Sequence, residues 1–175
     1  MSARWRSGSK TRGAKLFAVD SASSQPIVKR LGAQFVDRAE PVADYVARLT
    51  EGRDFDVVYD TVGGVVLDAS FAAVRRSGHV VSSLGWGTHS LAPLSLRAAT
   101  YSGVFTLLPL LTGEGRARHS EILSEAAWLA EAGQLVPTLD PRRFTLDTVG
   151  GAYHAIEDGT ACGKLVVDIG DGART

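Results

Sequence analysis

The stretch RGAKLFAVDSASSQPIVKRLGAQFVDR, Arg12 to Arg38, decides the fold class of this chain. Its apolar strand, Lys15 to Val19, precedes a helix from Gln25 to Leu31, which Pro26 opens and Gly32 ends. The segment QFVD then supplies a second strand. A strand, a helix and a strand in this order predict an α/β domain with a mostly parallel sheet.

The same alternation continues along the chain. Apolar residues spaced i, i+3, i+4 and i+7 predict a helix after Pro41: Val42, Tyr45, Val46 and Leu49. Further elements are predicted in order: a strand at Phe55 to Asp60, a helix from Val65 to Arg76 closed by Gly78, the strand HVVSSLG, and a last strand of the sheet at Tyr101 to Leu107. The first half of the chain therefore predicts a sheet flanked by helices.

The second half is less regular. It predicts a helix from Arg118 to Ala132, an extended crossing segment QLVPTLDPRRF, a capped helix in TLDTVGGAYHAIEDG and a final strand from Gly163 to Ile169. The helix carries one apolar stripe, Ile122, Leu123, Ala126, Leu129 and Ala130, with glutamates facing water. We expect an atypical basic segment at residues 1–11, one incomplete domain at 12–169 and a loose tail at 170–175.

Composition and charge exclude several classes of partner. The 175 residues include 19 basic and 19 acidic side chains, so we expect no nucleic-acid partner. The single cysteine, Cys162, rules out an internal disulfide and a multi-cysteine zinc site, which fits a cytoplasmic location. No apolar run reaches membrane-spanning length, so we expect no membrane partner.

In open α/β sheets the ligand binds outside the carboxyl ends of the strands. An acid there can accept hydrogen bonds from ribose hydroxyls, glycines let backbone approach a ligand, and Trp86 could flank a flat ring. Asp20 could instead cap the following turn, and Trp86 could be a core or interface residue. The candidate site residues are Asp20, Ser21, Arg38, Thr61, Val62, Gly63, Leu84, Gly85, Trp86, Phe105 and Thr106.

Neither a catalytic triad nor a metal cluster is predicted. The four histidines are scattered, and one cysteine adds no ligand spacing, so zinc is not expected. His79 and His119 are interpreted as surface or capping residues and His154 as a packing residue. His89 lies in a loop beside the predicted site, with little in the sequence to assign it a role.

Five segments carry a family resemblance: GAKLFAVDSASSQPIVKRLGAQFVDR, FDVVYDTVGG, SGHVVSSLGWG, GQLVPTL and GTACGKLVVDI. In order and spacing they resemble the cofactor domain of medium-chain dehydrogenases/reductases. The most similar branch is the quinone oxidoreductase type without zinc, whose family name is zinc-binding dehydrogenase. The resemblance covers Arg12 to Ile169 and implies a Rossmann-like parallel sheet with flanking helices.

The resemblance also implies an activity and a role for each candidate residue. The activity is hydride transfer from NADH or NADPH to a quinone or an activated alkene. Asp20 and Ser21 would face the adenosine ribose, and Arg38 could approach a 2′-phosphate. Thr61, Val62 and Gly63 would line the flank of the cofactor, while Leu84, Gly85, Trp86, Phe105 and Thr106 would lie toward the nicotinamide.

The choice between NADH and NADPH stays open. NADPH-preferring relatives carry a lysine at the position that corresponds to Ser24, and an acid at Asp20 favours NADH by repelling a 2′-phosphate. Arg38 and the serines after Asp20 favour NADPH. The resemblance further implies a homodimer formed through the edge strand at Tyr101 to Leu107.

The start of the chain departs from the resembled family. There, a substrate domain and a first strand with a glycine-rich turn precede the cofactor domain, and that strand is central in the sheet. MSARWRSGSKT contains neither strand nor turn. If GC-rich codons are assumed for this segment and read in another frame, the residues they encode resemble the start of the missing helix. This frameshift hypothesis predicts that the upstream DNA encodes the missing strand and substrate domain. The alternative is a genuine short protein.

Two functions therefore compete. One is a quinone- or alkene-reductase-type enzyme present only as its cofactor half. The other is a non-catalytic nucleotide-binding or dimerisation module, or an inactive gene remnant. Without a central strand, two edges would be left open inside the sheet, so we expect marginal stability and a tendency to associate.

Overall fold

The computed structural model describes residues 13–170. The basic segment predicted at residues 1–11 lies outside the described residues, as does the predicted tail apart from Gly170. The chain divides into two compact units, one formed by Lys15–Glu125 and the other containing the residues from Ala126 onward.

The first unit opens with a small parallel sheet. β1 (Phe17–Asp20) and β2 (Gln34–Asp37) pair in parallel, with Asp20 opposite Asp37. The 3-10 helix η1 (Ala22–Ser24) and α2 (Gln25–Arg30) connect them, and Pro26 stands in the first turn of α2. Ala18, Val28 and Ala33 form the core between α2 and the strands. The predicted strand, helix and strand are confirmed, with the first strand beginning at Phe17.

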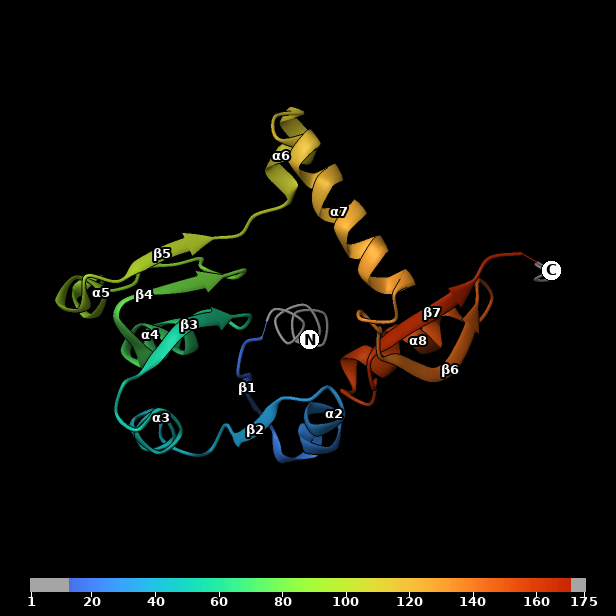
Figure 1. Ribbon diagram of the computed structural model, residues 1–175. Coiled ribbons are helices and arrows are strands. Elements are labelled where there is room, and N and C mark those ends of the chain that lie inside the picture. The colour runs from blue at the N-terminus through green and yellow to red at the C-terminus, as the bar shows by residue number, and fades with distance from the viewer. Residues whose placement is uncertain (1–12, 171–175) are drawn as a thin grey trace. The chain divides into compact units, whose positions relative to one another are not determined.

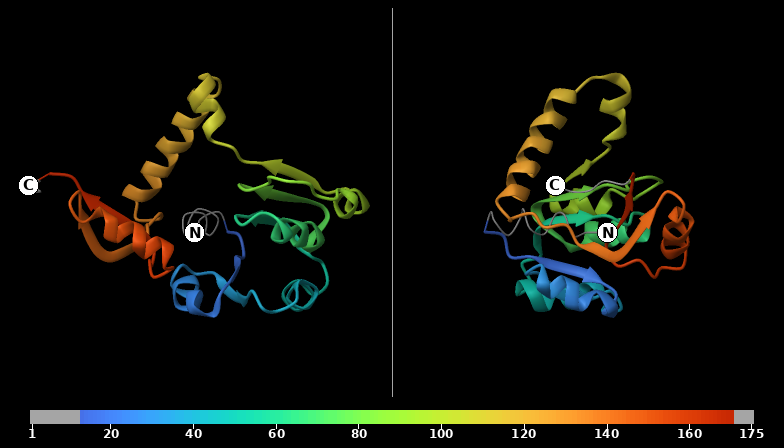
Figure 2. Two further views of the ribbon diagram at one scale, coloured as in Figure 1. Left: turned by 180° about the vertical axis from the view of Figure 1, so that it is seen from behind. Right: turned by 90° about the vertical axis from the view of Figure 1, so that its right-hand side faces the viewer.

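A second parallel sheet follows in the same unit. Its strand order is β3 (Phe55–Asp60), β4 (Val74–Ser82) and β5 (Thr100–Gly103). Figure 1 shows these strands side by side with their arrowheads at the same edge, and Figure 2 shows them from behind. The connecting helices are α3 (Val42–Thr50), α4 (Val65–Ala73) and α5 (Ala92–Arg97).

Two apolar clusters fill this unit. Helices α4 and α5 contribute Leu67, Phe71 and Leu94 to a core with Val74 and Val80 of β4. In the other cluster Tyr45 and Val46 of α3 pack with Val36 of β2, and Val42 and Leu49 pack against it, so the predicted stripe of α3 is confirmed. Phe17 of β1 also lies against Phe55 of β3, with ring centroids 5.3 Å apart. Among the described residues β1 and β3 nevertheless belong to separate ladders.

The helix predicted from Val65 to Arg76 ends early, at Ala73, so the assignment of Gly78 as its stop is wrong. Val74 is fully buried and pairs with Phe55 as the first residue of β4. Gly78 serves the strand instead, because a Cβ there would lie 2.9 Å from the carbonyl oxygen of Asp56. Pairing with β3, which is not visible in the local sequence, overrides the helical pattern.

The strand predicted at Tyr101 to Leu107 is also too long. β5 ends at Gly103, and Leu107 begins α6 (Leu107–Thr112). Pro109 lies in the first turn of α6, where a backbone N–H needs no helical partner, and Gly113 ends the helix with φ +81°.

The long helix α7 (Arg116–Glu131) leads into the second unit, which holds β6 (Leu139–Thr145), α8 (Val149–Glu157) and β7 (Lys164–Asp168). The predicted helices and the final strand are confirmed within a few residues. The predicted stripe of α7 is not buried, since Ile122 and Leu123 are exposed. β6 pairs with β7 in parallel, with a register shift between Leu139 and Arg143 that contains Pro141.

Candidate functional site

A buried carboxylate joins the turns that follow β3 and β4. Asp60, the last residue of β3, is 3% exposed. Its Oδ1 accepts hydrogen bonds from the backbone N–H groups of Val62 and Gly63, both at 3.0 Å. The hydroxyl of Ser82, the last residue of β4, donates to Asp60 Oδ2 at 2.6 Å and accepts from the N–H of Leu84 at 3.0 Å. This hydrogen-bond network therefore holds the turns after β3 and β4, and it offsets the free-energy cost of burying the Asp60 carboxylate.

Two glycines let these turns touch. Gly63 has φ +77°, and a Cβ there would lie 2.3 Å from the carbonyl oxygen of Leu84. Gly85 faces β5, where a Cβ would lie 1.9 Å from the hydroxyl oxygen of Tyr101. At Gly63 the close atom is backbone, so only a residue without a side chain fits, whereas at Gly85 a side chain would displace the Tyr101 hydroxyl. The turns after β3 and β4 are thus packed against each other and against β5.

An exposed aromatic pair stands beside these turns. Trp86 and Phe105 meet edge to face, with ring centroids 5.2 Å apart and an angle of 89° between the ring planes. They remain 63% and 47% exposed, so Trp86 is not a core residue of this unit. The structure therefore gathers one group of predicted residues at the carboxyl edge of this sheet: Thr61, Val62, Gly63, Leu84, Gly85, Trp86, Phe105 and Thr106.

The other predicted residues lie at the carboxyl ends of β1 and β2. The N–H of Ser21 donates to Asp20 Oδ1 at 2.8 Å, and the N–H of Arg38 donates to the carbonyl of Asp20 at 2.9 Å. The Ser21 hydroxyl lies 2.9 Å from that of Ser23 and 3.4 Å from that of Ser24. Asp20 therefore bonds the N–H of the residue next to it, beside a cluster of three hydroxyls, while η1 has no side-chain cap.

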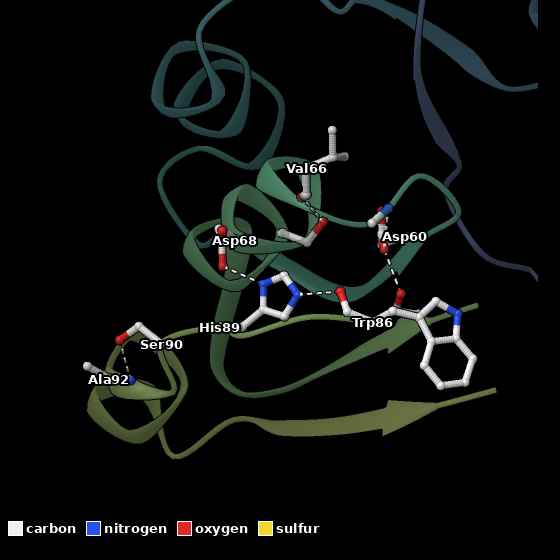
Figure 3. A network of polar contacts seen from close by, with 10 residues as sticks. Asp60, Val66, Asp68, Trp86, His89, Ser90 and Ala92 are labelled. Carbon is white, nitrogen blue, oxygen red and sulfur yellow. Dashed lines mark hydrogen bonds and ion pairs between the residues drawn. The ribbon is translucent and has the colours of Figure 1, made fainter. Parts of the chain in front are cut away.

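His89, which the sequence placed in a loop beside the predicted site without a role, makes two polar contacts in the structure. Its Nδ1 lies 2.9 Å from Asp68 Oδ1 on α4, and its Nε2 lies 3.3 Å from the carbonyl oxygen of Trp86 (Figure 3). These hydrogen bonds, the one to Asp68 first, raise the pKa of His89 above its ordinary value. The only hint in the sequence was Gly87 between Trp86 and His89, because a glycine permits a sharp turn there. In the structure its φ is +113°.

A second buried carboxylate lies in the unit of β6 and β7. Asp140 is 3% exposed and accepts hydrogen bonds from the side chain and N–H of Arg142 and from the N–H of Cys162 at 2.7 Å. The Arg142 guanidinium and these N–H groups hold the pKa of Asp140 well below its usual range. Because these hydrogen-bond donors, from Arg142 and Cys162, belong to the same unit, we interpret this cluster as a structural clamp.

Among residues 13–170 no group of three or more histidine, cysteine, aspartate or glutamate side chains is placed to hold a metal ion. In the same range no helix has both the length and the apolar character needed to cross a membrane.

Comparison with known proteins identifies the family. The model of a protein family described as zinc-binding dehydrogenase matches residues 31–167. The chain belongs to the zinc-binding dehydrogenase family. This confirms the resemblance stated from the sequence, and the parallel sheets with their flanking helices correspond to the Rossmann-like half of dehydrogenase structures.

Relatives of this dehydrogenase family extend well beyond the present chain. A solved structure of an alcohol dehydrogenase superfamily protein from Novosphingobium aromaticivorans is 52% identical, with a TM-score of 0.83, over 87% of this chain and 46% of that one. A 2-methylene-furan-3-one reductase of Solanum lycopersicum is 28% identical over 87% of this chain and 33% of its own length.

A third relative is much longer. The highly reducing polyketide synthase AN6791 of Emericella nidulans is 30% identical over 140 residues, which are 77% of this chain and 5% of the synthase. The chain thus spans about half of the solved dehydrogenase structure and a third or less of these two curated relatives.

Proposed function

We propose that this chain is the cofactor-binding part of an NAD(P)H-dependent oxidoreductase that reduces a quinone or an activated alkene. The observation that carries this proposal is the convergence of three turns beside the exposed Trp86–Phe105 pair, in a member of a dehydrogenase family. Ligands of open α/β sheets bind at this edge, outside the carboxyl ends of the strands.

The residues after β1 fit the adenosine end of a dinucleotide. The carboxylate of Asp20 lies at the carboxyl end of β1, and carboxylate oxygens accept hydrogen bonds from ribose hydroxyls. The hydroxyls of Ser21, Ser23 and Ser24 add donors and acceptors at the same turn. These carboxylate and hydroxyl groups therefore suit a sugar. The exposed Arg38, directly after β2, is the cationic residue nearest in sequence to the end of that strand.

The residues after β3 and β4 fit a flat ring system. Gly63 and Gly85 keep the turns free of side chains, and the edge-to-face pair offers an exposed aromatic surface. When bound, a nicotinamide supplies the hydride. The contribution of Trp86, Phe105 and the neighbouring backbone would be to orient the ring and to exclude water from one side of it.

The proposed substrate class rests on the relatives. The tomato relative is named for reduction of 2-methylene-furan-3-one, a ketone conjugated to a methylene group, and another relative is a highly reducing polyketide synthase. Activated alkenes are therefore the favoured acceptors, with quinones as the second class. A non-catalytic nucleotide-binding module remains the competing function.

Cofactor choice is proposed to depend on two residues. The carboxylate of Asp20 disfavours a 2′-phosphate, whereas the guanidinium of Arg38 favours one. Because the two residues lie at adjacent strand ends, their separate removal distinguishes NADH from NADPH binding.

Titration of the purified chain with NADH and NADPH, followed by nicotinamide fluorescence, tests this proposal. We expect saturable binding, and Asp20→Ala to weaken NADH binding by roughly tenfold or more, as for a lost hydrogen bond to a charged group. Arg38→Gln should weaken NADPH binding and leave NADH binding unchanged. Asp56→Asn is the matched control, because Asp56 lies exposed near the amino end of β3.

Each outcome separates the candidate functions. Binding with oxidation of NAD(P)H by an enone or a quinone supports the enzyme, and binding without turnover supports the module. Absence of binding by wild-type protein would overturn both. A homodimer through β5 and a cytoplasmic location, which rests on the single cysteine, also remain proposals.

A further inference from the structure

His89 ties the loop that carries Trp86 to helix α4. The loop follows β4, and its near end is already fixed by the bond from the Leu84 N–H to Ser82. The far end is fixed by the imidazole, which lies between the Asp68 carboxylate and the Trp86 carbonyl. Figure 3 shows the imidazole between these two groups, with the indole of Trp86 projecting away from it.

The partners of the ring determine its protonation. A carboxylate and a backbone carbonyl both accept hydrogen bonds and neither donates. A neutral imidazole has one N–H and can donate to only one of them, whereas the imidazolium donates to both. Both contacts are therefore satisfied at once only when His89 carries its proton.

The surroundings of the ring favour that charged form. The charged groups that act on it are Asp68 of α4 and Asp60 at the end of β3, both of which are acids. The ring is largely covered, with its side chain 12% exposed, and Phe71 of α4 meets it edge to face at 6.2 Å. Partial burial lowers the pKa of His89, but the hydrogen bonds outweigh it and the direction is upward.

We propose that His89 is a protonation-dependent positioning residue, whose imidazolium holds the Trp86 loop on α4 and so keeps the Trp86–Phe105 pair in place. Loss of the proton breaks one of the two contacts and frees the loop. Since Gly87 adds little restraint of its own, the far end of the loop then depends on the following residues alone. The inference rests on the proposed function in that Trp86 flanks the nicotinamide.

The first test observes Trp86 without any cofactor. In the 175-residue chain, Trp5→Phe and Trp128→Phe leave Trp86 as the single tryptophan of three. Its fluorescence and acrylamide quenching are followed from about pH 5 to 9, around the ordinary histidine range. We expect one transition with a midpoint above that of a free histidine. His89→Gln should abolish it, and Asp68→Asn should shift its midpoint downward.

His79→Gln is the matched control, because His79 lies in β4 of the same unit, with its Nδ1 against the Thr100 hydroxyl, and should leave the transition unchanged. Histidine Cε1 resonances in the NMR spectrum give the pKa of His89 directly and do not depend on how the variants fold. A transition that persists in His89→Gln, a flat wild-type profile, or an Asp68→Asn variant with an unchanged midpoint would overturn the proposal.

The second test separates this inference from the proposed function. NADH affinity is measured on either side of the Trp86 transition, and we expect a loss of about fivefold or more at the higher pH, at the lower end of typical couplings. His89→Gln should bind equally at both pH values. Failure to bind NADH at any pH refutes the proposed function while the cofactor-free transition still stands; pH-independent binding refutes the coupling alone.

Discussion

Gly63 shows how one residue without a side chain positions a site. Its φ of +77° resembles the +81° of Gly113 at the end of α6, but the surroundings differ. A Cβ at Gly63 would lie 2.3 Å from the Leu84 carbonyl oxygen, whereas the nearest atom to one at Gly113 is Arg116 Nε at 3.9 Å. Substitution at Gly113 therefore tests the cost of the left-handed backbone alone, whereas substitution at Gly63 adds a steric clash.

We predict that Gly63→Ala destabilises the chain more than Gly113→Ala. The second change should cost about 1–2 kcal/mol, the left-handed penalty alone. The first should cost about 1–3 kcal/mol more, because a backbone oxygen has to move. Urea unfolding followed by circular dichroism measures both values, and equal losses would show that the turns after β3 and β4 are not in contact.

At the scale of elements, β6 and the segment before β7 depend on the Asp140 clamp. The carboxylate collects donors from Arg142 and Cys162, at the register shift where Pro141 interrupts the ladder. Because the folded-state pKa of Asp140 is depressed, its contribution to stability is present above the unfolded pKa, about 3.9, and declines as pH falls below it.

We therefore predict that Asp140→Asn lowers the melting temperature at neutral pH, and that its difference from wild type shrinks as pH falls below about 4. Differential scanning calorimetry at pH 7 and pH 3 measures this. Asp147→Asn is the control, since Asp147 is exposed in the same unit. A difference between wild type and Asp140→Asn that stays constant across this pH range would contradict the role assigned to the charge.

The sequence largely predicted which segments form helices and which form strands, but it did not always predict where these elements end. The apolar spacing of Val42, Tyr45, Val46 and Leu49 predicted α3 and its buried face, because helix periodicity is a local property. The boundary between α4 and β4 was wrong because Val74 joins β4 through its pairing with Phe55. That contact lies nineteen positions away in sequence and leaves no local pattern.

At the scale of the whole molecule, the described strands form three separate parallel sheets, and within the first unit β1 pairs only with β2 and β3 only with β4. The apolar cluster around Tyr45, Val46 and Val36 packs against Phe17 and Phe55 without joining the two sheets of this unit. The predicted separation of the strands is thus present in the described residues. Marginal stability remains a prediction.

We predict a homodimer formed through β5. The Val104 N–H bonds to Ser82 of β4, so by strand alternation the Gly103 N–H points away from the sheet. Gly103→Pro removes this outward donor and should convert the dimer to a monomer in sedimentation velocity. Gly103→Ala keeps the donor, and its Cβ would meet the Tyr101 hydroxyl at an ordinary 3.7 Å. A Gly103→Pro variant that still dimerises would place the interface elsewhere.

The sequence by itself determined the alternation of strands and helices, the family, and which residues follow each strand, because periodicity, caps and order are local. Only the tertiary structure brought Gly63 against the Leu84 carbonyl and closed the Asp60–Ser82 bond. It alone placed His89 between Asp68 and the Trp86 carbonyl. The Gly63–Leu84, Asp60–Ser82 and Asp68–His89 contacts join residues about twenty positions apart, and they form only when parallel strands bring their carboxyl ends to one edge.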